Sequence, residues 1–69
     1  MIGKVKWYNP VKGFGLIRTK IDREKADVFV YYTEIKDEGR TQLKEDDSVE
    51  FDLAYKYETP VAINVYTVK

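Results

Sequence analysis

Alternation of polar and apolar residues is the feature of this chain that most limits its fold. It is clearest in SVEFDLAY (residues 48–55), where the apolar residues Val49, Phe51 and Leu53 alternate with acidic residues. Successive side chains of a strand point to opposite faces, so this period of two indicates a strand with one face in a core. Four further short segments are predicted to be strands: residues 2–8, 14–19, 27–32 and 61–68. No segment keeps a helical period, which predicts an all-β protein.

The connections between these segments indicate the topology. Asn9-Pro10 marks one turn and residues 57–59 mark another. Residues 21–26 are polar and charged and are predicted to form a loop, with room for one helical turn, and residues 34–43 form a long connection. Five short strands with little helix favour a small antiparallel barrel, which pairs its sheet edges and fills its interior with side chains.

The composition excludes several classes of function. A chain of 69 residues is expected to form one domain, residues 1–69. It has no cysteine and no histidine, so it lacks disulfides, thiolate ligands and the commonest general base. We therefore expect no enzyme activity, no cofactor and no metal, and assign the acidic run at residues 45–47 to a solvated turn. Short apolar runs and a start unlike a signal peptide indicate a cytoplasmic or nucleoid location, without membrane contact.

The charges are unevenly distributed along a chain of zero net charge. Residues 1–20 contain five basic residues and no acid, so residues 21–69 carry a balance of −5. Such asymmetry can create a positive face on a neutral protein. Charges scattered over the whole surface would, however, give the same charge balance for the two segments.

Aromatic residues of two predicted strands fall on the face opposite the small apolar residues. In DVFVYY the alternation puts Val28 and Val30 on one face and the two rings Phe29 and Tyr31 on the other. If the second and third strands are neighbours, four side chains form one exposed patch with Lys6 and Lys12 at its margin: Phe14, Leu16, Phe29 and Tyr31. Exposed apolar patches usually mark binding sites, and rings beside cations suit single-stranded nucleic acid. Gly13 and Gly15 flank Phe14 and are expected to permit a turn and a close backbone approach.

Together these stretches resemble the cold-shock domain family. KGFGLI (residues 12–17) resembles its first ribonucleoprotein motif and DVFVYYTEI (residues 27–35) its second. KVKWYN (residues 4–9) matches its first strand, and LKEDDSVEFDL (residues 43–53) and PVAINV (residues 60–65) match its last two. The resemblance implies a five-stranded antiparallel OB-fold barrel that binds single-stranded RNA and DNA as an RNA chaperone, and we expect a monomer.

The resemblance also implies which residues contact nucleic acid. The main contacts would be Lys6, Trp7, Lys12, Phe14, Leu16, Asp27, Phe29, Tyr31 and Tyr32, with Asp27 as a polar contact to a base edge. Peripheral contacts would be Tyr8, Asn9, Arg40, Lys56 and Tyr57.

Several positions depart from the family pattern. Tyr31 and Tyr32 stand where the family usually has His and Phe, and Leu16 replaces a ring, so one stacking position loses its π-face. Arg40 replaces a ring after Gly39 and can stack through its guanidinium or meet phosphate. The segment 18–26 is longer than usual and lacks glycine, as does the turn at residues 56–59.

The alternation and the resemblance disagree about Trp7. Its parity matches that of Val5 and predicts a buried ring, whereas the resemblance predicts a ring on the binding face. A bulge would reconcile the two. For Tyr8 we favour packing over a place in the site, and for Phe51 we expect the core.

Two other functions remain open from the residues alone. The aromatic patch could receive a peptide or another subunit, as aromatic grooves of interaction barrels do. KGFGLI also partly fits the helix-containing ribonucleoprotein domain, although the chain lacks two amphipathic helices.

Overall fold

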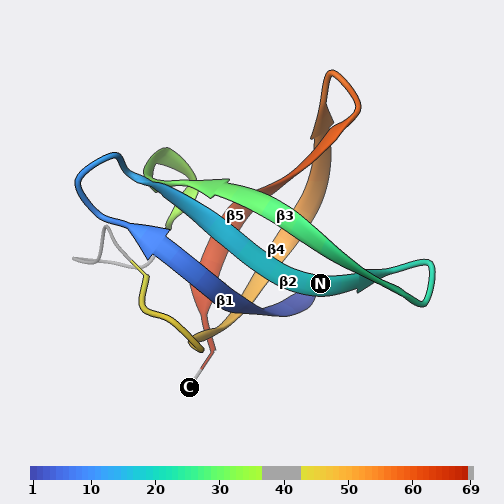
Figure 1. The fold of residues 1–69 in the computed structure, drawn as a ribbon, viewed down its shortest axis with the longest axis horizontal. Helices are drawn as coiled ribbons and strands as arrows, with labels where there is room; N and C mark the ends of the chain where they lie inside the picture. The colour runs from blue at the N-terminus through green and yellow to red at the C-terminus, as the bar shows by residue number, and fades with distance from the viewer. Residues whose placement is uncertain (37–42, 69) are drawn as a thin grey trace.

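Five strands close into a barrel in the computed structural model, which describes residues 1–36 and 43–68 (Figure 1). The strands are β1 Ile2–Asn9, β2 Phe14–Ile21, β3 Glu24–Tyr31, β4 Ser48–Lys56 and β5 Thr59–Thr67, and the 3-10 helix η1 Tyr32–Glu34 follows β3. The predicted all-β barrel is thus confirmed. Across the described ranges, no helix has the length and apolarity needed to cross a membrane.

The strands follow the order β1-β2-β3-β5-β4 around the barrel. All neighbours are antiparallel except β3 and β5, which are parallel and paired only through Phe29 with Val61 and Val30 with Ala62. The barrel is therefore mostly antiparallel, as predicted, with this one parallel pairing. An odd number of strands cannot alternate direction all the way around a closed barrel, so one pairing has to be parallel.

Small and β-branched side chains fill most of the barrel interior. The buried hydrophobic residues are Val5, Ile17, Val28, Val30, Ile35, Leu43, Val49, Phe51, Ala62 and Val65. Phe51 is the largest side chain that is fully buried, which confirms its predicted place. Val28 and Val30 also lie inside, as the alternation predicts. The interior holds one phenylalanine, so most of the other rings lie on or near the surface.

The segment predicted to be a loop at residues 21–26 is a tight hairpin instead. Strand β2 continues to Ile21 and β3 begins at Glu24, so only Asp22 and Arg23 turn the chain. Both have positive φ, 52° and 71°, as the mirror-image turns of two-residue hairpins require. The polar residues around the turn belong to paired strands whose outer face meets solvent. The β4–β5 hairpin turns in the same way at Tyr57 and Glu58, with φ of 50° and 71°.

A bulge in β1 determines which way Trp7 points. Val5 pairs with Ile17 and Trp7 pairs with Leu16, so two steps along β1 match one step along β2. The extra residue is Lys6, and the bulge reverses the alternation after it. Trp7 therefore lies outside, 38% exposed, and the burial predicted from its parity is wrong. Tyr8 turns inward and packs against the core, as we expected for that residue.

The Asp22–Arg23 turn generates a prediction about stability. Arg23 has φ of 71°, and a residue with a Cβ is strained there by roughly 1–2 kcal/mol. Arg23→Gly removes this strain but makes the unfolded chain more flexible, so we expect a net gain of about 0.5–1 kcal/mol in the free energy of unfolding. Arg23→Ala, which keeps the Cβ, should show no such gain. Equal stability of the two variants in urea denaturation would contradict this account.

The inward position of Tyr8 generates a second prediction. Burial raises the pKa of Tyr8 above its ordinary 10.0, and the nearby Tyr32 adds to the effect. The pKa of Tyr8 is therefore higher in the folded protein than in the unfolded chain. The stability that the neutral phenol contributes is fully present below pH 10 and is lost as the pH rises through the pKa of the folded state. Tyr8→Phe should therefore show a smaller fall in the free energy of unfolding above about pH 10 than the wild type. Parallel pH profiles from urea denaturation would test this, and identical alkaline slopes would contradict it.

Candidate nucleic-acid interface

The outer face of β1, β2 and β3 gathers most of the predicted site residues in cross-strand rows. One row contains Trp7, Leu16 and Phe29, which are successive register partners. The next row contains Asn9, Phe14 and Tyr31. The patch predicted from neighbouring strands is thus present, and the bulge in β1 adds Trp7 to it.

The rings of this face contact one another in an ordered arrangement. Trp7 and Phe14 meet edge to face, with ring centroids 5.6 Å apart and planes at 75°. Phe14 and Tyr31 lie 6.4 Å apart at a tilt of 38°. Phe14, Leu16 and Phe29 are half-buried, whereas Tyr31 and Tyr32 are 42% and 55% exposed. We call this surface the aromatic platform: Trp7, Phe14, Leu16, Phe29, Tyr31 and Tyr32.

The loop between β1 and β2 fixes one edge of the platform. The side-chain oxygen of Asn9 accepts hydrogen bonds from the backbone amides of Val11 (3.0 Å) and Lys12 (3.1 Å). Gly13 has φ of 74°, and a Cβ there would lie 2.6 Å from the ring of Tyr32. The amide of Tyr32 also donates to the carbonyl of Gly13 at 2.9 Å. Asn9, predicted as a peripheral contact, therefore has its carbonyl oxygen engaged in shaping the loop.

Gly15 allows β1 and β2 to approach closely below the platform. A Cβ on Gly15 would collide with the carbonyl oxygen of Trp7 and lie 2.9 Å from the Cα of Tyr8. The close approach predicted for this glycine is confirmed. It keeps the ring-bearing segment around Trp7 in a defined position.

Asp27 lies between two cations at the edge of the platform. Its carboxylate oxygens lie 3.3 Å from Nζ of Lys6 and 3.6 Å from Nε of Arg18. All three side chains are 38–53% exposed, and ion pairs this accessible contribute little to stability. The arrangement can therefore exchange partners at small cost when an anion or a hydrogen-bond donor approaches.

The remaining predicted residues are placed less uniformly. Lys12 is exposed in the loop beside Gly13. Lys56 lines a pocket of about 340 Å³ together with Tyr31 and Val61, which brings it next to the platform. Tyr57 is 92% exposed at the tip of the β4–β5 hairpin. Arg40 lies outside the described residues.

Sequence reasoning missed two residues of this surface. Arg18 was counted only as a charge, although the alternation after Phe14 and Leu16 places it on their face. Val61 pairs with Phe29 across the parallel seam, a neighbour that no local pattern reveals. For the described part of the chain, no group of three or more carboxylates is placed to hold a metal ion.

Comparison with known proteins agrees with this geometry. The family model described as "'Cold-shock' DNA-binding domain" matches residues 1–68. The chain is 44% identical over 66 residues to the probable cold shock protein A of Mycolicibacterium smegmatis, covering 96% of each chain. It is 44% identical over 66 residues to the cold shock-like protein CspC of Bacillus cereus, covering 94% of this chain and 95% of the relative.

A third relative supports the same assignment. The chain is 42% identical over 66 residues to the cold shock-like protein CspC of Buchnera aphidicola, covering 96% of this chain and 93% of the relative. The proteins of this family bind nucleic acids and are not enzymes. The closed five-stranded barrel, its outward-facing rings and these matches together show that the chain belongs to the cold-shock domain family.

Proposed function

We propose that the protein binds single-stranded RNA and DNA with little sequence preference, and that the aromatic platform supplies most of the affinity. The observation that carries this proposal is the contact chain from Trp7 through Phe14 to Tyr31 on an open sheet face. Each base offers a π-face, and stacking on a protein ring is worth about 1–3 kcal/mol per base. Because every base can stack, the binding tolerates different sequences.

The same surface discriminates against duplex. A paired base has its faces covered by its neighbours, so it cannot lie against Phe29 or Tyr31 without unstacking. With zero net charge on the protein, long-range attraction to phosphate does not compensate for that loss. Only strands that are already open, or open readily, then bind well.

Preference for open strands leads to chaperone activity without an energy source. A protein that binds only unpaired strands shifts the equilibrium between paired and unpaired nucleic acid by mass action. The shift grows with the ratio of the protein concentration to Kd. Weak RNA hairpins would therefore melt, whereas stable duplexes would persist. The platform has one weakened position, since Leu16 covers a base but offers no π-face.

The direct test compares a labelled oligothymidine with a duplex of the same length. Trp7 is the only tryptophan and lies within the platform, so its fluorescence reports on the site itself. We expect quenching by the single strand and weak binding of the duplex. Equal affinities, or binding without any change in Trp7 fluorescence, would contradict the proposal. Concentration-dependent sedimentation of the free protein would instead favour a protein-interaction surface.

Removing one ring tests the stacking term. Phe29→Ala should weaken oligothymidine binding by about 1–3 kcal/mol. Phe29→Leu should lose part of this energy, because it restores apolar volume without a π-face. Tyr66→Ala is the matched control: Tyr66 is 50% exposed on β5 and pairs with Glu50, away from the platform. If all three variants bind equally well, the ring has been assigned to the wrong role.

Salt dependence tests the electrostatic term. Lys6 and Lys12 flank the platform, and each phosphate contact on a single strand contributes about −0.7 to the slope of log K against log salt. For a strand just long enough to cover the platform we therefore expect a slope of about −1.4. Titrations across a range of potassium chloride concentrations give the slope. A much steeper slope would mean that charge, and not stacking, dominates the binding.

A further inference from the structure

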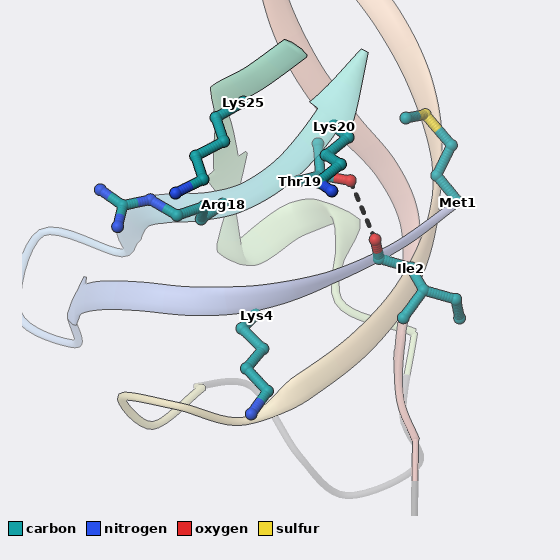
Figure 2. A pocket seen from close by; sticks show the side chains of 7 residues that line it. All are labelled: Met1, Ile2, Lys4, Arg18, Thr19, Lys20 and Lys25. Atoms are coloured by element: carbon teal, nitrogen blue, oxygen red, sulfur yellow. Dashed lines mark hydrogen bonds between the residues drawn. The ribbon is translucent and has the colours of Figure 1, made fainter. Parts of the chain in front are cut away.

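A second concave surface lies beyond the platform, at the base of the β2–β3 hairpin. It is a pocket of about 550 Å³ (Figure 2). Met1 and Ile2 give it an apolar side and are 41% and 58% exposed. The charged side chains that line it are all basic: Lys4, Arg18, Lys20 and Lys25. Such a surface combines positive charge with an apolar wall.

Within this surface, basic residues occupy opposed register positions on neighbouring strands. Lys20 pairs in register with Lys25, and Lys4 pairs with Arg18. Directly opposed like charges destabilise a sheet. Arg18 has a partner in Asp27, but across residues 1–36 and 43–68 no carboxylate pairs with the ammonium of Lys20 or of Lys25. The hairpin therefore carries a repulsion that an external anion would relieve.

Three of the four cations belong to the β2–β3 hairpin. Figure 2 shows Arg18 and Lys25 extending side by side from β2 and β3, whereas Lys4 points away from them. The hydroxyl of Thr19 donates to the carbonyl of Ile2 at 2.9 Å, which ties β2 to the start of β1 and holds the apolar wall beside the charges. We call Arg18, Lys20 and Lys25 the hairpin cluster.

The hairpin cluster continues the face that carries the platform. Along β2, Arg18 and Lys20 follow Leu16 on the outer side, and each step of two residues advances about 6.6 Å. On β3, Asp27 and Lys25 take the corresponding positions beyond Phe29. A smaller pocket of about 350 Å³ contains Arg18, Lys25 and Asp27 and links the cluster to the ion pair beside Lys6. No barrier of acidic residues other than Asp27 separates the two surfaces along these strands.

We propose that the hairpin cluster binds phosphates of the same single strand whose bases stack on the platform. This inference rests on the proposed function and extends it by naming a second contact region and the direction in which a longer strand runs. A strand that leaves the Leu16–Phe29 row passes Asp27 and places its phosphates at Lys20 and Lys25. A sugar or base then lies against Ile2. The occupied length is set by both regions, and the second region contributes mainly through charge.

The test is a length series of oligothymidines with the double variant Lys20→Gln/Lys25→Gln. A strand of about four nucleotides, the lower end of OB-fold site sizes, should bind the variant and the wild type equally. A strand of about ten nucleotides should bind the variant with a salt slope smaller in magnitude by about 1.4, since two phosphate contacts are lost. If these two contacts contribute nothing at about 1 M salt, the variant should bind the long strand roughly 25-fold more weakly than the wild type at about 0.1 M salt.

The matched control is Lys36→Gln/Lys44→Gln, which removes the same charge from two exposed lysines outside the hairpin. It should retain the wild-type affinity and slope at every length. Equal binding of the long strand by wild type and Lys20→Gln/Lys25→Gln would overturn the inference and leave the cluster to some other anionic partner. An equal loss at all lengths, or the same loss in the control, would also overturn it by indicating a general effect of net charge. If the wild type binds neither strand, the proposed function itself fails.

A stability measurement provides an independent readout. Lys25→Glu places opposite charges across the hairpin at the Lys20 position, so the midpoint of thermal unfolding should rise while long-strand affinity falls. That opposite movement supports the cluster, because a merely structural role would make both quantities fall together. Unchanged long-strand affinity overturns the inference whatever the midpoint does.

Discussion

The bulge at Lys6 is the constraint on which the rest of the site depends. Without the extra residue, β1 would keep a strict alternation and direct Trp7 into a barrel already filled by Val5, Ile17 and Phe51. The bulge reverses the alternation, so Trp7 faces outward and Tyr8 packs inward. The same residue supplies the cation that meets Asp27. One inserted position thus creates both the aromatic and the charged part of the surface.

The aromatic platform and the hairpin cluster occupy different parts of one face of this protein. The rings occupy the centre of the β1–β2–β3 face with Lys6 and Lys12 at their margin, while the cations of the hairpin cluster lie toward the β2–β3 turn. The acidic residues of the second half balance the net charge to zero. A polyanion would therefore be attracted locally, and under the proposed function the affinity for a strand would depend on where it lies and how far it extends.

Much of the fold could be predicted from the alternation alone. In β2 and β3 it assigned Val28 and Val30 to the interior and Phe29 and Tyr31 to the surface, because a regular ladder preserves the period of two. It failed at Trp7, because a bulge leaves no local mark in the sequence, and only the family resemblance indicated the exposed ring. It also failed at residues 21–26, because Asp22-Arg23 lacks the glycine that usually marks a two-residue hairpin. The register of that hairpin, and with it the meeting of Lys20 and Lys25, could not be inferred before the turn was located.

The short parallel seam between β3 and β5 links the integrity of the barrel to the integrity of the site. Two residue pairs join β3 and β5 in the described ranges, and a parallel bridge between Ile35 and Val65 continues the junction. One of the two pairs includes Phe29, whose ring belongs to the platform. The seam joins the β1–β2–β3 meander to the β4–β5 hairpin on one side of the barrel, as the β1–β4 pairing does on the other. A strand stacked on Phe29, as proposed, would contact a residue that also takes part in closing the barrel. Because such a ligand would bind only the folded state, its binding would also raise the free energy of unfolding.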